Sequence, residues 1–126
     1  KDIKMLDLGK YYFIKPDPTL KNNLMAFGAE CGEGWYPLLE KTLDKILEYL
    51  ETLNFPDDFQ IVQIKEKWGT LTIYTNYSDE FIDRVLHDAR HESVNICEFC
   101  GMPGTIEQLN GWYKAVCSKC KEEYSN

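Results

Sequence analysis

The chain has 126 residues, 44% of them hydrophobic and 28% charged, and its 21 acidic against 14 basic residues give a net charge of −7. These values are typical of a globular protein and exclude wholesale disorder and fibrous chains. The acidic balance also disfavours a generic binder of duplex DNA, whose phosphates attract basic surfaces. No apolar run in the sequence reaches the length of a membrane span, about 18 residues or more.

Residues 1–27 are predicted to form an arm that covers the core. Their start contains no apolar stretch of signal-peptide length, so we expect no export signal. The aromatic run at residues 11–14 is followed by Lys-Pro-Asp-Pro. Because proline restricts both its own backbone and that of the preceding residue, we expect only some strand or short helix here.

Residues 36–53 carry the clearest helical pattern. Pro37 falls in the first turn, where its missing N–H costs nothing. Apolar residues recur at helical spacing at Leu39, Leu43, Ile46, Leu47, Leu50 and Leu53. The next two segments, residues 60–67 and 70–76, are rich in β-branched and aromatic residues and flank Trp68-Gly69, which predicts a β-hairpin.

A second helix is predicted after the hairpin. Ser78 can cap its start, and acidic residues fill its first turn. One narrow face carries Ile82, Val85, Leu86, Ala89 and Ser93. The order of elements is therefore arm, helix, hairpin and helix, followed by a cysteine-rich tail.

Two C-x2-C pairs form the strongest motif in the sequence: Cys97 with Cys100, and Cys117 with Cys120. Their separation lies in the range that zinc modules use. Between the pairs, residues 105–109 and 112–116 flank Asn110-Gly111, a strong signal for a two-residue hairpin. Residues 117–124 then have the composition of a helix. This arrangement predicts a treble clef or zinc ribbon.

The predicted fold class is α+β, with a helix–hairpin–helix core and a C-terminal zinc module that uses four cysteines. Residues 1–96 would form the arm and core, and residues 97–126 the zinc-binding module packed on it. Four thiolates leave no open coordination position, so Zn²⁺ is expected to be structural. Two disulfides would instead suit a secreted chain and leave a fifth cysteine over, and a redox C-x-x-C normally occurs once. We interpret the four cysteines as zinc ligands in preference to both alternatives.

No catalytic template is present in the sequence. It contains no nucleophile elbow, zinc-protease helix, P-loop or dinucleotide fingerprint. His87 and His91 stand four residues apart but point away from the apolar helix face, and we interpret them as solvated. Cys31 lacks an activating base nearby in the sequence and is interpreted as a small buried thiol. We expect no enzymatic activity, unless residues that sequence alone cannot assemble supply one.

One flank of the first predicted helix is acidic and carries Glu40, Asp44, Glu48 and Glu51. Like charges three or four residues apart repel each other on a helix. This acidic flank either keeps the protein in solution, docks onto a basic protein partner, or mimics the charge of nucleic acid.

Three segments resemble, in the same order, a family of small phage and prophage proteins without an assigned activity. Residues 27–35 resemble the family pattern F-G-[FA]-E-C-G-x-G-W, and residues 63–74 resemble V-K-E-K-F-G-x-L-R-F-Y. The third segment is Cys97-x-x-Cys100-Gly101 with Gly111-Trp112 and Cys117. Trp68 stands where the family usually has Phe, and Thr72 where it usually has Arg. The resemblance implies a phage-encoded accessory protein in the host cytoplasm that binds zinc and catalyses no reaction.

Three binding functions follow from these observations. In the first, which we favour, the acidic flank and aromatic surfaces dock onto a host protein, such as a component of antiviral defence, and block it. In the second, the loop with Glu30, Trp35 and Tyr36 and the turn with Lys65, Lys67 and Trp68 form a pocket for a small anion such as a nucleotide. The two indoles, of Trp35 and Trp68, would then lie on neighbouring parts of one surface.

The third function is nucleic-acid binding by the zinc ribbon. It would use the tail lysines Lys114, Lys119 and Lys121, although acidic residues at positions 107, 122 and 123 dilute their charge.

Overall fold

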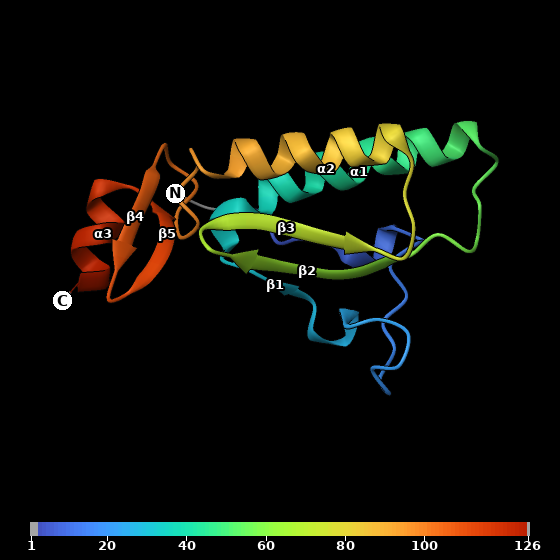
Figure 1. The fold of residues 1–126 in the computed structure, drawn as a ribbon, viewed down its shortest axis with the longest axis horizontal. Helices are drawn as coiled ribbons and strands as arrows, with labels where there is room; N and C mark the ends of the chain where they lie inside the picture. Colours follow the sequence, from blue (N-terminus) through green and yellow to red (C-terminus); the bar gives the residue numbers. More distant parts are fainter. Residues whose placement is uncertain (1–2, 126) are drawn as a thin grey trace.

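Two helices lie side by side along a three-stranded sheet, and a second, two-stranded sheet with a short helix follows at one end (Figure 1). This computed structural model describes residues 3–125. The remaining positions, 1, 2 and 126, are the outermost residues of the two predicted parts, 1–96 and 97–126, and lie outside the described residues. The α+β class expected from the sequence is confirmed. The elements are α1 (Tyr36–Thr52), α2 (Glu80–Ser93), α3 (Ser118–Ser125), β1 (Ala29–Glu30), β2 (Ile61–Lys67), β3 (Thr70–Thr75), β4 (Thr105–Leu109) and β5 (Trp112–Val116).

The three-stranded sheet has the order β1-β2-β3. Strands β2 and β3 are antiparallel, with Lys65 opposite Thr72 and Lys67 opposite Thr70. The short strand β1 pairs parallel to β2 and was not predicted, because two residues are too short to show a pattern. The turn between β2 and β3 has positive φ at both Trp68 (52°) and Gly69 (84°), as a tight hairpin turn requires.

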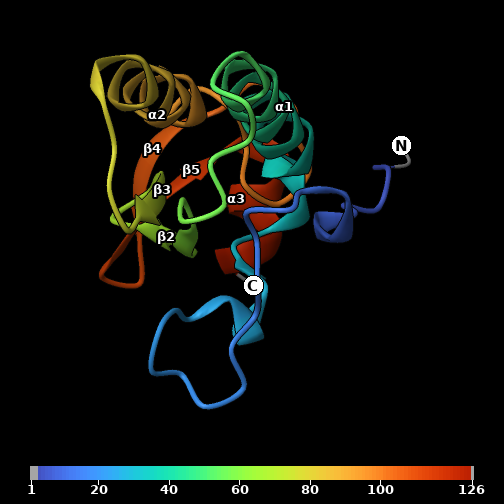
Figure 2. The same cartoon turned by 90° about the vertical axis from the view of Figure 1, so that its right-hand side faces the viewer.

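Helix α1 buries one side because its apolar residues recur at helical spacing. Six of its residues are buried: Leu38, Leu39, Thr42, Leu43, Ile46 and Leu50. Viewed end-on, α1 and α2 lie next to each other above the sheet (Figure 2). Each fully buried Leu or Ile stabilises the fold by about 1.5–3 kcal/mol relative to an exposed one.

Helix α2 begins one residue later than the predicted cap implies. The residue that caps it is Asp79, whose side chain accepts a hydrogen bond from the N–H of Ile82 (2.9 Å). Ser78 instead donates from its hydroxyl to Asp83 (2.5 Å). The expected cap at Ser78 is therefore wrong by one position, since both residue types can cap a helix and the sequence did not separate them.

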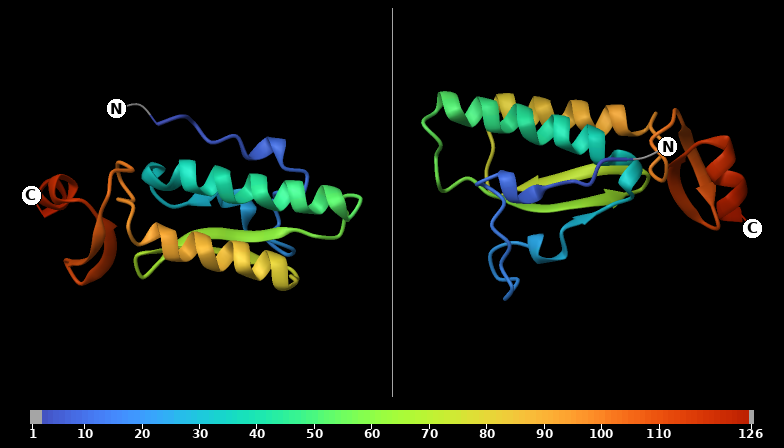
Figure 3. Two further views of the ribbon diagram at one scale, coloured as in Figure 1. Left: turned by 90° about the horizontal axis from the view of Figure 1, so that it is seen from above. Right: turned by 180° about the vertical axis from the view of Figure 1, so that it is seen from behind.

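The N-terminal arm runs beside α1, on the side away from α2, and meets the sheet at the start of β2 (Figure 3). Within residues 3–27, its regular structure consists of short 3-10 turns at Leu8–Lys10 and Met25–Phe27. Its aromatic residues enter the core: Tyr11 and Phe13 are fully buried, and the carbonyl of Phe13 accepts a hydrogen bond from the N–H of Ile61 (3.1 Å). The arm is thus part of the hydrophobic core rather than a loose cover.

Candidate metal centre

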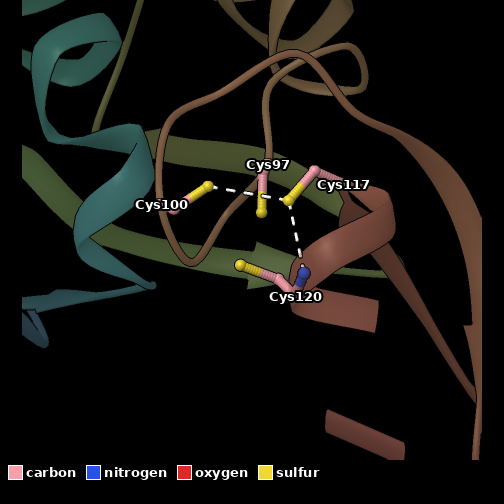
Figure 4. A group of neighbouring side chains, drawn as sticks. All are labelled: Cys97, Cys100, Cys117 and Cys120. Carbon is pink, nitrogen blue, oxygen red and sulfur yellow. Dashed lines mark hydrogen bonds between the residues drawn. The ribbon is translucent and has the colours of Figure 1, made fainter. Parts of the chain in front are cut away.

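Four cysteine thiols converge on one point between the loop before β4 and the start of α3 (Figure 4). The Sγ atoms of Cys97, Cys100, Cys117 and Cys120 all lie within 4.8 Å of one another. The Sγ atoms of Cys100 and Cys117 are 3.7 Å apart. A tetrahedral centre with metal–sulfur bonds of about 2.3 Å requires sulfur–sulfur separations of about 3.8 Å. A disulfide needs only about 2 Å, and all five cysteines are free thiols. The four residues are therefore arranged as a site that could hold a metal ion.

Residues 97–101, which we call the knuckle, present the first two thiols. The N–H of Gly101 donates to the carbonyl of Cys97 (2.9 Å), and the N–H of Cys97 donates to the carbonyl of Met102 (2.7 Å). Gly101 has a φ of +83°, which glycine adopts without steric cost. This tight turn directs the side chains of Cys97 and Cys100 to the same side.

The second pair of thiols sits at the start of α3. The N–H of Cys120 donates to the Sγ of Cys117 (3.4 Å). This hydrogen bond, together with the neighbouring thiols, lowers the pKa of Cys117 to about 7, whereas burial raises the pKa of Cys100 and of Cys120. The thiolate is the form that binds metal. Cys117 therefore loses its proton more readily than Cys100 or Cys120, and a bound cation would favour the thiolate form of the cysteines that hold it.

The body of the protein, residues 3–96, meets the knuckle main chain at two glycines. The N–H of Gly34 donates to the carbonyl of Glu98 (2.8 Å). A Cβ at Gly34 would lie 2.2 Å from the carbonyl oxygen of Cys97, and one at Gly32 would lie 2.4 Å from that of Glu98. Neither distance is possible for a real side chain. Residues 32 and 34 are glycine because the knuckle occupies the space that a side chain would need.

The same loop anchors the knuckle through Trp35. This residue is fully buried, and its indole Nε1–H donates to the carbonyl of Ile96 (2.9 Å), the residue before the first cysteine. The expectation that Trp35 lines a ligand pocket and shares a surface with Trp68 is wrong, because Trp35 lies in the core. Tyr36, the first residue of α1, is only partly exposed. The predicted pocket at this loop is filled by the knuckle itself.

Buried charges complete the junction. The carboxylate of Glu98, inside the knuckle, accepts a hydrogen bond from the N–H of Gly32 (2.9 Å). The ammonium of Lys114 on β5 lies 3.5 Å from Glu98 and 3.3 Å from Glu66 on β2. Burial tends to lower the pKa of Lys114, but the two carboxylates outweigh it and raise this pKa. One ammonium thus links the hairpin β2–β3, the hairpin β4–β5 and the knuckle.

Sequence reasoning placed neither Glu98 nor Lys114 in this junction. Glu98 lies between Cys97 and Cys100, and the sequence alone does not indicate that this charged side chain is buried. Lys114 was assigned to the basic residues of the tail. The register of the hairpin places Lys114 opposite Glu107 on β4. The position of Lys114 in the junction becomes visible only once the fold is known.

The fifth cysteine, Cys31, lies outside the four-thiol cluster and packs half-buried against the main core. Burial, with Glu98 and Glu66 nearby, raises its pKa to about 12. A thiol with such a pKa stays protonated and is a poor nucleophile at neutral pH.

The remaining predicted site residues lie on two other faces. Lys67 and Trp68 are exposed, Lys65 is partly exposed, and Glu30 is exposed on β1. On the acidic flank of α1, Lys10 of the arm forms ion pairs with Glu40 (2.9 Å) and Asp44 (3.7 Å). Glu48 and Glu51 are exposed. The structure therefore splits the predicted flank into a half paired with the arm and a half that faces solvent.

Comparisons with known proteins give no match: no family model, curated protein or solved structure is similar to this chain. Among residues 3–125, no helix is long and apolar enough to cross a membrane.

Proposed function

We propose that this protein is a non-enzymatic binding protein of the phage accessory type, which docks onto a host protein and blocks it. In this proposal the four-cysteine centre holds a structural Zn²⁺ in a treble-clef or zinc-ribbon module. All four ligand positions are supplied by the chain, so such a centre has no open position for a substrate. The knuckle is also packed against Gly34, which suits a role in holding the fold.

The observation that carries the docking proposal lies at the C-terminal end of α1. Leu53 and Phe55 expose 47% and 49% of their surface, and Phe55 is held at a φ of +54° while its N–H donates to the carbonyl of Leu50 (2.9 Å). Beside them on the helix, Glu48 and Glu51 have no ion-pair partner among residues 3–125. Exposed apolar side chains that follow two unpaired carboxylates on the helix fit a basic protein surface with an apolar centre.

The lysines of the tail give little support to nucleic-acid binding. Lys114 is held between two carboxylates, and Lys121 pairs with Glu107 (3.0 Å). Of the three tail lysines, only Lys119 has no ion-pair partner in the described chain. A concentrated basic stripe, which phosphate binding needs, is therefore missing from this part of the described structure.

Two experiments test the proposal. Native mass spectrometry of freshly purified protein should show one zinc ion per chain, and a metal-free, folded protein would overturn the zinc assignment. Capture from host cells should then retain one partner with the wild type and with the control Glu122→Lys/Glu123→Lys, but not with Glu48→Lys/Glu51→Lys. The control makes the same change in net charge, but on α3. Docking by α1 would be contradicted if both variants lost the partner equally, or if none of the three proteins retained a partner.

A further inference from the structure

One face of the hairpin β2–β3 carries two lysines that form no ion pair within residues 3–125. Lys65 and Thr72 are direct cross-strand partners, and so are Lys67 and Thr70, so these four side chains leave the sheet on the same face. Glu66, between the two lysines, points to the opposite side and pairs with Lys114. We call the face with Lys65 and Lys67 the front face.

Helix α2 packs along β3 and places a third cation, Arg90, next to this strand. A hollow of about 190 Å³ between β3 and α2 is lined by residues that include Thr72, Asp83, His87 and Arg90. Thr72 is thus the register partner of Lys65 and lines the same hollow as Arg90. The hydroxyls of Thr70 and Thr72 are 3.3 Å apart and supply further polar groups.

These three cations lack carboxylate partners, as several other cations of the described chain also do, whereas four cations have them. Lys10, Lys41, Lys114 and Lys121 each form an ion pair of 3.5 Å or less. Lys65, Lys67 and Arg90 form none within residues 3–125, and the Nζ of Lys67 has only the hydroxyl of Tyr74 at 3.4 Å. In a chain with a net charge of −7, two unpaired lysines on one face, with an unpaired arginine near the adjacent strand, are available to an anion.

Two carboxylates lie near these cations and limit how strongly the front face attracts an anion. Glu30 on β1 is the register neighbour of Lys65, and its Oε1 accepts a hydrogen bond from Gln63 (3.0 Å). Asp83 on α2 accepts one from the hydroxyl of Ser78 (2.5 Å). Both carboxylates are engaged with neutral donors, so they reduce the positive charge of the front face without pairing with its cations.

Trp68 adds an aromatic surface at the end of the front face. Its side chain is 76% exposed, and the Nζ of Lys67 lies 5.9 Å from the centre of its ring. The residue adopts a φ of +52°, which is unfavourable for a large side chain. Trp68 directly follows Lys67 at the end of β2 and lies three positions after Lys65, so the indole stands at the end of the row that the two lysines form.

We propose that the front face binds a nucleotide, with its phosphates at Lys65 and Lys67 and its base against Trp68. This site differs from the docking surface on α1 and from the pocket expected from sequence, whose other wall is filled by the knuckle. It uses the lysine pair and the indole of the hairpin, and Arg90 of α2 lines the hollow beside Thr72.

Calorimetric titration of the metal-loaded protein at about 50 mM salt tests this assignment, with ADP, adenosine and inorganic phosphate as probes and no Mg²⁺. ADP should bind at least about tenfold more tightly than either fragment, because only ADP reaches both the cations and the indole. Lys65→Gln/Lys67→Gln should weaken ADP binding about tenfold, and Trp68→Leu about fivefold. Glu30→Gln should tighten it about twofold, since it removes the opposing charge next to Lys65.

The matched control is Lys45→Gln/Lys119→Gln, which removes the same charge from other surfaces and should leave the ADP affinity within about twofold. The nucleotide site is overturned by absent ADP binding, by an equal loss in this control, or by phosphate binding as tight as that of ADP. An oligonucleotide of ten thymidines that binds more than about tenfold more tightly than ADP, with the same variant pattern, would overturn it in favour of a strand. None of these outcomes depends on the docking surface of α1, so the two proposals fail independently.

Discussion

The loop at residues 32–35 and the turn at residues 68–69 both place a tryptophan next to a glycine, yet they use the two residues in opposite ways. In the loop, Gly34 provides space for the knuckle, and Trp35 is fully buried. In the turn, Gly69 provides a φ of +84°, and Trp68 is 76% exposed. The comparison teaches that the first pair holds the fold together, whereas the second displays a side chain to solvent.

Removal of the proposed metal ion should have its largest effect on the loop; at the turn it should remove the packing of Ile106 against Gly69 and leave Trp68 exposed. The apparent binding free energy of a structural zinc ion in small modules is about 10–16 kcal/mol, so a chelator or Cys100→Ser should unfold residues 97–125. Circular dichroism and thermal melting, with elemental analysis of zinc, would measure this change. Cys31→Ser, whose thiol lies outside the cluster, is the control and should keep the metal. A metal-free Cys100→Ser protein with unchanged melting would contradict the structural role.

Gly34→Ala should cost the next largest amount. Its Cβ would lie 2.2 Å from the carbonyl oxygen of Cys97, and main-chain atoms on both sides cannot yield easily, so we expect a loss of about 3 kcal/mol or more in the free energy of unfolding. Gly111→Ala is the matched control. It stands at a φ of +87° with nothing within 4 Å of its Cβ, and left-handed backbone costs a non-glycine residue about 1–2 kcal/mol. If chemical denaturation showed the same loss of unfolding free energy for both variants, the close packing of the knuckle would not be the reason for glycine at residue 34.

Substitution of the two tryptophans by phenylalanine should separate the regions further. Trp35→Phe keeps an aromatic ring but removes the indole N–H that donates to the carbonyl of Ile96, and an unsatisfied buried acceptor costs about 1–3 kcal/mol. Trp68→Phe alters an exposed side chain and should change stability by less than about 0.5 kcal/mol. Urea unfolding of both variants measures the difference, and the reverse order would refute the assignment of core and surface.

A smaller, pH-dependent effect is expected at Asp79, far from both regions. A hydrogen bond from the N–H of Ile82, and a second from the hydroxyl of Tyr49, lower the pKa of Asp79 below its ordinary value of 3.8. The folded pKa is depressed, so this contribution is fully present above about pH 4 and is lost as the pH falls further. Asp79→Ala should cost about 1 kcal/mol at pH 7 and less at pH 3. Asp79→Ala should cost the same unfolding free energy in a Gly34→Ala background. A different cost there would show that the two sites are coupled.

The sequence predicted regular elements well where one physical rule decides them. The apolar spacing of α1, the Asn110-Gly111 turn and the cysteine spacing each depend on a few neighbouring residues. The contacts of Gly32 and Gly34 with Glu98 join segments more than 60 residues apart, and the glycines had been interpreted as part of a ligand pocket. Trp35 and Trp68 were grouped because both end glycine-containing motifs, although burial depends on tertiary packing. The ion pairs of Lys10 with the acidic flank also required the path of the arm, which no local pattern specifies.

Hydrogen exchange of the loop amides tests most directly whether the metal centre holds the body and the knuckle together. The N–H groups of Gly32 and Gly34 donate to the side chain and the carbonyl of Glu98, which lies between Cys97 and Cys100 of the four-cysteine centre. On chelation, these two amides should lose their protection together with the knuckle, while amides in the middle of α1 should exchange as before. Unchanged protection at Gly32 and Gly34 in the metal-free protein would contradict the account.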